Sequence, residues 1–275
     1  MFPFWHTLSV QEGLHLEGKE DVVTITRSAW AGQARHAAAT WSGDTQSTFA
    51  SLAVSVPAGL NAQLSGISWW TLDIGGYSGG NPSDPTFNRL IVRWFEFGLT
   101  LPIFRQHGQR DTEPWLLSNH TSYELVVQLI KTRYSLTEFV SSALNQTAAT
   151  MLPIMRPLPW DFPGDPDTGL ATAAEGAYLF GEGLLARPIV EDNTDEVAVY
   201  LPKGPPAWID CASGKSYPSG QTVTIPAPLG TLPLLKRSDM AASVDALIAA
   251  GVAKYPGKAL PAEQVCVPGS GVSVA

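Results

Sequence analysis

Over the first 150 residues, short apolar stretches that end in polar residues alternate with segments of helical periodicity. Strands are predicted over residues 21–26, 37–41, 67–74 and 99–104, and helices over residues 45–60, 84–98 and 123–144. Short apolar runs bounded by turn residues favour buried strands, and strands that alternate with helices favour a parallel sheet. The pattern therefore predicts an α/β fold for this part of the chain.

Charged side chains follow the ends of these predicted strands. Arg27 follows the first, Asp44 comes after the second in the motif WSGD, and Asp73 ends the third in WWTLDIGG. Arg105 and His107 close the fourth, in FRQHG. Because the parallel strands of a barrel bring their carboxyl ends to one mouth, we expect these side chains to converge there.

From residue 151 the pattern changes, because prolines become frequent and helical periodicity disappears until about residue 241. Short segments such as AYLF, EVAVYL and QTVTIP are separated by Gly, Pro and Asp turns. This spacing is typical of a small β-sandwich. We therefore divide the chain into residues 1–150, residues 151–240 and a tail at 241–275, which begins with a helical stretch and has no other predicted structure.

The composition limits the classes of function. The 275-residue chain is 44% hydrophobic, with a formal net charge of −8 and a pI of about 5.1. Length and hydrophobic content predict a globular protein of two domains, and the acidic balance argues against nucleic acid as a partner. No apolar run approaches the ~20 residues of a membrane span, and the N-terminal segment lacks a signal-peptide pattern. No phosphate-binding or paired Cys/His motif is present, so we expect no cofactor and no metal.

The sequence leaves the compartment, the cysteine pairing and the oligomeric state open. Asn119 and Asn145 begin N-glycosylation triplets, which favour secretion only weakly because such triplets often arise by chance. Cys211 and Cys266 lack the spacing of metal ligands, and the sequence does not say whether they pair.

Further motifs continue in a fixed order along the chain. RSAWAG, WSGD, WWTLDIGG, RWFEFG and FRQHG are followed by MRPLPWDFPGDP, YLFGEGLLARPIV, VYLPKG and APLGTLPLL. Together they resemble glycoside hydrolase family 31, the α-glucosidases and α-xylosidases, over roughly residues 22–237. The resemblance implies the C-terminal half of a (β/α)8 TIM barrel followed by a β-sandwich domain.

Family members also carry an upstream WxDxxE motif whose aspartate is the catalytic nucleophile. This chain contains no such motif. A full barrel needs about 200 residues or more, whereas only residues 1–150 precede the predicted sandwich. We therefore expect the chain to be the C-terminal portion of a larger enzyme, either a natural fragment or a truncated gene model.

The resemblance assigns roles to the charged residues. A retaining glycosidase uses two carboxyl groups ~5 to 5.5 Å apart, one as nucleophile and one as acid/base. Asp44 matches the acid/base aspartate of the family's WxGD motif. Asp73 matches the aspartate that holds the site's arginine, here Arg105, and contacts sugar hydroxyls. The other predicted sugar-binding residues are Arg27 and His107, together with the aromatic residues Trp41 and Tyr77, whose rings suit stacking on sugars.

Structural alternatives exist for these assignments. An aspartate before a helical run is a favoured N-cap, which would give Asp44 a structural role. Asp73 could itself be the missing nucleophile, Arg27 and Arg105 could form structural ion pairs, and His107 could be a structural histidine.

The predicted function is that of a retaining α-glycosidase. Its substrate would be an oligosaccharide or α-glycoside with a terminal non-reducing α-linked xylose or glucose, and the forms of WWTLDIGG and FRQHG slightly favour xylose. We expect neither nucleic acid nor membrane as a partner. The alternative is a non-catalytic carbohydrate-binding or scaffold protein derived from such an enzyme.

Overall fold

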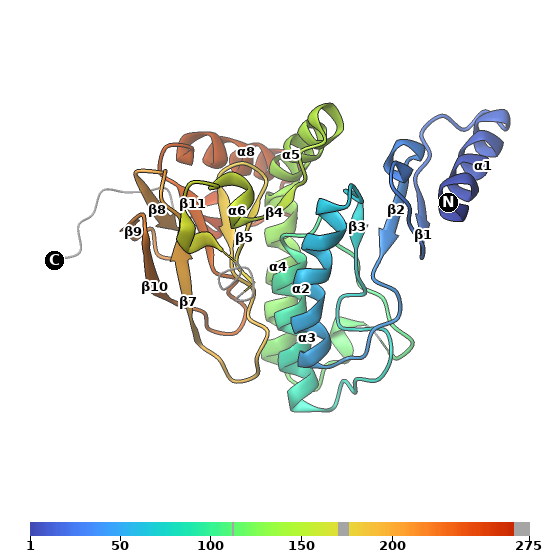
Figure 1. Cartoon of the computed structure of the whole chain (residues 1–275). Coiled ribbons are helices and arrows are strands. Elements are labelled where there is room, and N and C mark those ends of the chain that lie inside the picture. The colour runs from blue at the N-terminus through green and yellow to red at the C-terminus, as the bar shows by residue number, and fades with distance from the viewer. Residues whose placement is uncertain (112, 170–175, 267–275) are drawn as a thin grey trace.

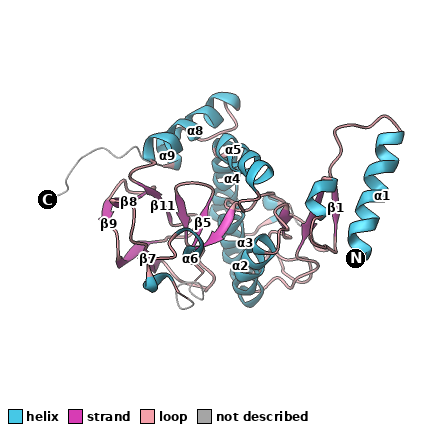
Figure 2. Ribbon diagram, turned by 45° about the horizontal axis from the view of Figure 1, so that its top comes forward, coloured by secondary structure: helices cyan, strands magenta, loops and turns pink. Residues whose placement is uncertain are grey.

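The computed structural model describes residues 1–111, 113–169 and 176–266. A small parallel sheet lies at one side of the molecule, a layer of helices in the middle and an antiparallel β-structure at the other side (Figure 1). Figure 2 shows the same order from a second direction, with the two termini at opposite ends. None of the described helices is long and apolar enough to cross a membrane.

Within the described residues, the parallel sheet has three strands in the order β1 (Thr24–Thr26), β2 (Ala38–Trp41) and β3 (Trp70–Thr71). Helix α1 (Phe2–Leu16) packs against η1 (Gln33–His36), a short 3-10 helix before β2. Helix α2 (Phe49–Leu64) joins β2 to β3, and α3 (Pro85–Gly98) follows β3. A parallel bridge between Ile74 and Gln106 continues the sheet beyond β3. The predicted α/β alternation is therefore confirmed.

The central layer consists of α2, α3, α4 (His120–Ser135) and α5 (Thr137–Thr150), with η2 (Pro114–Leu116) before α4. Helix α3 begins where the Asp84 side chain accepts a hydrogen bond from the Thr86 N–H at 2.9 Å, with a proline in its first turn. It is buried on nearly every side: Trp94 and Phe97 are fully buried. One continuous apolar core joins this layer to both flanking sheets.

The C-terminal part is a two-sheet β-structure, as predicted for a sandwich. One sheet has the order β4-β5-β6-β11-β8-β9, and β7 pairs with β10 in the other; all these pairs are antiparallel. The strands are β4 (Met155–Pro157), β5 (Tyr178–Phe180), β6 (Leu184–Ala186), β7 (Glu196–Leu201), β8 (Ala207–Asp210), β9 (Ser216–Pro218), β10 (Gln221–Pro226) and β11 (Leu234–Arg237). Between and after them lie the helices α6 (Leu158–Asp161), η3 (Pro166–Thr168), α8 (Ala241–Lys254) and α9 (Ala262–Val265).

The tail is partly ordered by a disulfide. Cys211, just after β8, is bonded to Cys266, just after α9, which answers the pairing question that the sequence left open. Helix α8 confirms the helical stretch predicted at the start of the tail. Residues 267–275 of the predicted tail lie outside the described residues.

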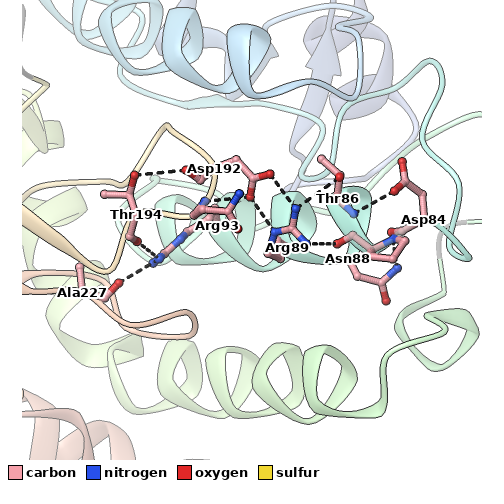
Figure 3. Close-up of polar contacts among 10 residues, drawn as sticks. Asp84, Thr86, Asn88, Arg89, Arg93, Asp192, Thr194 and Ala227 are labelled. Carbon is pink, nitrogen blue, oxygen red and sulfur yellow. Dashed lines mark hydrogen bonds and ion pairs between the residues drawn. The ribbon is translucent and has the colours of Figure 1, made fainter.

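Polar contacts, most of them partly buried, fasten α3 to the sandwich (Figure 3). The Arg89 guanidinium donates two hydrogen bonds to the Asp192 carboxylate, both at 2.7 Å. Arg93 donates to the carbonyls of Thr194 at 2.5 Å and Ala227 at 2.9 Å. Because α3 leads directly into residues 99–107, these contacts link the sandwich to the predicted mouth of the barrel.

The structure corrects two strand predictions. Residues 21–26 do not form a buried strand, because β1 is the edge of the three-stranded sheet and leaves Val23 and Ile25 exposed. Residues 99–104 form no strand, because the N–H groups of Leu99, Thr100 and Leu101 bond back to carbonyls of residues 95–98. The chain thus continues from α3 in tight turns and becomes extended only near Gln106.

The single helix predicted over residues 123–144 is also wrong, since α4 and α5 are separate helices that meet at Leu136. Helix α8 crosses at this point: a Cβ atom added to Gly251 would lie 2.2 Å from the Ser135 carbonyl oxygen. The Ser135 hydroxyl donates to the Leu260 carbonyl at 2.8 Å. The break between α4 and α5 therefore lies where the C-terminal part of the chain packs against them. Hydrophobic periodicity along the sequence does not reveal such a contact.

Candidate active site

Asp44 lies on the loop after β2 with its carboxylate open to solvent. Its side chain is 34% exposed, and its Oδ2 lies 3.4 Å from Nη1 of Arg27, whose side chain is 64% exposed. The preceding Gly43 has a φ of +78°, so the loop turns sharply beside the Arg27 side chain. The N-cap of α2 is Thr48, whose side chain accepts a hydrogen bond from the Ser51 N–H. Asp44 is therefore not the cap of α2, and the structural alternative considered for it loses its basis.

Asp73 has the opposite surroundings. It follows β3, its side chain is fully buried, and its Oδ1 accepts a hydrogen bond from Nη1 of Arg105. The predicted Asp73–Arg105 pair therefore forms. The Ile74 N–H donates to the Arg105 carbonyl at 3.1 Å, which holds the two strand ends together. The second carboxylate oxygen, Oδ2, has no hydrogen-bond partner among the described residues.

Aromatic rings lie beside these charged pairs. The Arg105 guanidinium carbon is 5.8 Å from the centroid of the Trp41 ring, and the Tyr77 and His107 rings are 5.4 Å apart. The Tyr77 N–H donates to the Thr45 carbonyl at 2.8 Å, so the loop that carries Tyr77 is bonded to the residue after Asp44. The structure thus brings the predicted residues together in linked groups at adjacent strand ends.

Arg110 also belongs to this site, although it is not among the residues predicted from the sequence motifs. Its guanidinium donates to the carbonyls of Gly76 at 2.5 Å and Gly75 at 3.0 Å, and to Oγ of Ser47 at 3.1 Å. Burial lowers the pKa of Arg110, while the Asp73 charge acts in the opposite direction. The paired glycines gave a hint of this role, since a glycine turn leaves carbonyls that need donors.

The arrangement places one carboxylate where a ligand can reach it and a second one in a buried pair. A solvent-open carboxylate can exchange a proton with a bound group, whereas one held by arginine is suited to fixing geometry.

Groups of three or more His, Cys, Asp or Glu that could hold a metal do not occur among the described residues. A separate cavity of about 270 Å³ is lined in part by Arg35, just before β2, and Trp69, just before β3. It lies at the opposite strand ends and contains none of the candidate residues.

Two family models match the chain. Residues 1–143 match the TIM-barrel domain of glycosyl hydrolases family 31, and residues 151–241 match the C-terminal domain of glycosyl hydrolase family 31.

Curated relatives and solved structures match across most of the chain. It is 36% identical over 238 residues to an α-xylosidase of Saccharolobus solfataricus, covering 86% of this chain and 32% of the relative. It is 33% identical over 242 residues to the neutral α-glucosidase C of Mus musculus, covering 86% of this chain and 26% of that relative. The solved structure of a family 31 α-xylosidase from a soil metagenome, complexed with xylose, aligns with a TM-score of 0.81 and 34% identity, covering 88% of this chain and 38% of that structure's chain. A Flavobacterium johnsoniae dextranase complexed with glucose aligns with a TM-score of 0.75 and 31% identity, covering 83% of this chain and 28% of that structure's chain. The chain thus spans about a quarter to a third of the length of these curated relatives.

Proposed function

Because this chain belongs to glycosyl hydrolase family 31, we propose that it supplies the acid/base half of a retaining α-glycosidase site. The substrate would carry a terminal non-reducing α-linked xylose or glucose. In this proposal residues 1–150 are the C-terminal part of the catalytic barrel and residues 151–240 are the sandwich domain. The nucleophile would come from a segment that this sequence does not contain.

One observation carries the proposal. Asp44 and Asp73 follow adjacent parallel strands, yet Asp44 is solvent-open and Asp73 is buried against Arg105. An acid/base must reach the glycosidic oxygen and then a water molecule, so it needs the open position. A residue that orients sugar hydroxyls must hold its place, and an arginine partner supplies that restraint.

The reaction would proceed in two steps. The Asp44 carboxyl would donate its proton to the glycosidic oxygen while the bond from that oxygen to the anomeric carbon breaks, and the nucleophile would form a covalent bond to that carbon. The Asp44 carboxylate would then take a proton from the water that hydrolyses the glycosyl-enzyme. Arg27, Trp41, Tyr77 and His107, together with the Asp73–Arg105 pair, would form the sugar-binding wall.

A comparison of two proteins tests this proposal. The 275-residue chain alone should not hydrolyse aryl α-xylosides or aryl α-glucosides above background. A chimera should do so if it joins this chain to the part of the Saccharolobus solfataricus α-xylosidase that precedes the matched region.

Two outcomes would contradict the proposal. Turnover by the chain alone, abolished by Asp73→Ala and restored by azide, would make Asp73 the nucleophile. A folded chimera that binds xylose without hydrolysing either glycoside would favour the non-catalytic alternative.

A further inference from the structure

Residues 99–104 lead into Arg105 and His107 without pairing as a strand with the sheet. Arg105 and Gln106, just beyond this segment, are joined to Ile74 by a hydrogen bond and a parallel bridge, and the segment itself contacts β3 through a side-chain hydrogen bond from Thr71. The preceding residues form turns after α3, so no strand ladder fixes their direction. Some other part of the molecule must hold the carbonyl groups of this segment.

Arg133 on α4 provides most of that support. Its Nη1 donates to the carbonyls of Leu99 at 2.7 Å and Leu101 at 2.8 Å, and its Nη2 donates to the Pro102 carbonyl at 2.9 Å. Its guanidinium carbon also lies 5.8 Å from the centroid of the Phe104 ring. One planar side chain therefore holds three backbone groups and contacts the residue before Arg105.

The surroundings of Arg133 are unusual for a buried cation. The side chain is half-buried overall with its charged end enclosed by protein, and this burial lowers the pKa of the guanidinium to about 10. No carboxylate within the described residues forms an ion pair with it at 4.0 Å or less. Carbonyl dipoles at the C-terminal end of α3 compensate the charge instead, which is the favourable end of a helix for a cation.

Two further side chains hold the same segment from other directions. The Thr71 hydroxyl on β3 donates to the Ile103 carbonyl at 2.8 Å. The Tyr178 hydroxyl on β5 lies 2.5 Å from the Thr100 hydroxyl. Since Arg133 makes three of the contacts to this segment, removing it should loosen the segment most.

We propose that Arg133 is a positioning residue, which sets the place of Arg105 and His107 without touching a substrate. The proposal rests on the function proposed above, in which these two residues bind the sugar. Arg105 would stay correctly aligned with Asp73 only while residues 99–104 keep their path. Misplacement of a binding group by ~1 Å costs about 10²-fold in rate in enzymes, so such support would matter for activity.

Hydrogen exchange and NMR of the 275-residue chain test the proposal without any sugar. Arg133→Lys keeps the charge but loses the planar fork, so the Ile74 amide, which bonds to Arg105, should exchange at least ~10-fold faster. The Gly220 amide, which donates to Leu201 within the sandwich, should stay within about twofold of its unsubstituted rate. The His107 ring protons should also lose the shift that Tyr77 causes, defined by comparison with Tyr77→Leu.

Arg156→Lys is the matched control, because the Arg156 guanidinium is buried and also donates to backbone carbonyls, those of Pro153 and Gly181. It should speed exchange of the Gly181 amide and leave the Ile74 amide and the His107 signals unchanged. If Arg133→Lys does not fold, Arg133→Gln, which keeps a planar N–H donor group but no charge, should show the same pattern.

The proposal fails if Ile74 and His107 respond no more to Arg133→Lys than to Arg156→Lys. It also fails if all the amides speed up by one common factor, which would mean loss of global stability. Neither readout depends on sugar binding, so a failure of the proposed function appears separately, in the chimera assay.

Discussion

Asp44 and Asp73 show how position decides what a carboxylate can do. Asp44 has an exposed arginine neighbour, and an ion pair of this kind contributes only ~0 to 1 kcal/mol to stability, so a ligand could displace it at little cost. Asp73 is fully buried, and removal of Arg105 would leave its charge without its hydrogen-bonded partner, a change that typically costs about 3 to 5 kcal/mol for a buried pair. The two residues therefore suit different roles although both follow strands of one sheet.

Glu96 gives a pH-dependent prediction at the residue scale. Burial raises the pKa of this carboxyl from 4.5 to about 7, while the adjacent Arg93 opposes the rise. A pKa raised on folding stabilises the folded state below the unfolded pKa, and the contribution is lost as pH rises from about 4.5 through 7. Relative to Glu96→Gln, the unsubstituted chain should therefore lose on the order of 3 kcal/mol of unfolding free energy across this window. Urea denaturation of both proteins at pH 4.5 and pH 8 measures this difference, and a difference that stays constant with pH would contradict the assignment.

At the scale of elements, the sequence predicted the parts of the fold that local patterns specify. Strands β2, β5, β7 and β10 and helix α8 appear where alternation and turn residues indicated them. The wrong predictions concern segments whose contacts with residues distant in the sequence override the local preference for a strand or a helix. Residues 99–104 have the apolar composition of a strand but are held by Arg133, and the helix break at Leu136 lies where α8 crosses. The same holds for the candidate site. Sequence motifs identified Asp73 and Arg105. Arg110 was missed because it binds backbone carbonyls, and every residue has a carbonyl whatever its side chain.

The turn after β3 gives a prediction with a matched control. Gly76 and Gly66 both have a φ of +76°, but a Cβ atom on Gly76 would lie 2.7 Å from the Ser47 Cα atom, whereas Gly66 has open space around it. Gly66→Ala should cost ~1 to 2 kcal/mol from backbone strain alone. Gly76→Ala should cost about 1 to 3 kcal/mol more, because the backbone of the Asp44 loop must move. Chemical denaturation gives both values, and equal costs would mean that the close approach of the two loops is absent.

At the scale of the whole molecule, the helical layer is covered on both sides but the parallel sheet is not. The core extends from α2 and α3 through to β5, β6 and α8. At the other side, β1 pairs within the described residues with β2 alone. Large apolar side chains are exposed on α1 and between residues 23 and 30: Phe2, Trp5, Val23, Ile25 and Trp30. Such an unpaired edge with apolar neighbours favours association with another polypeptide.

We therefore expect the 275-residue chain to self-associate in solution, and Ile25→Lys on β1 should reduce this. A charged residue on an edge strand disfavours edge-to-edge pairing. Trp160→Lys is the control, because Trp160 is exposed to a similar extent, 50% against 47%, but lies on α6 in the C-terminal part. Sedimentation velocity should show a lower association constant for Ile25→Lys alone. A monodisperse monomer of the unsubstituted chain would overturn this expectation.

The most direct test of the central claim is the effect of Asp44→Ala in the active chimera on substrates with different leaving groups. General acid assistance is typically worth ~10²- to 10⁴-fold, and the leaving oxygen of a natural disaccharide needs it far more than dinitrophenolate does. The variant should therefore bind substrate normally, lose far more glycosylation rate on a disaccharide than on a dinitrophenyl glycoside, and gain deglycosylation rate when azide is added. If Asp44→Ala slowed both substrates equally and azide accelerated neither, Asp44 would not be the acid/base.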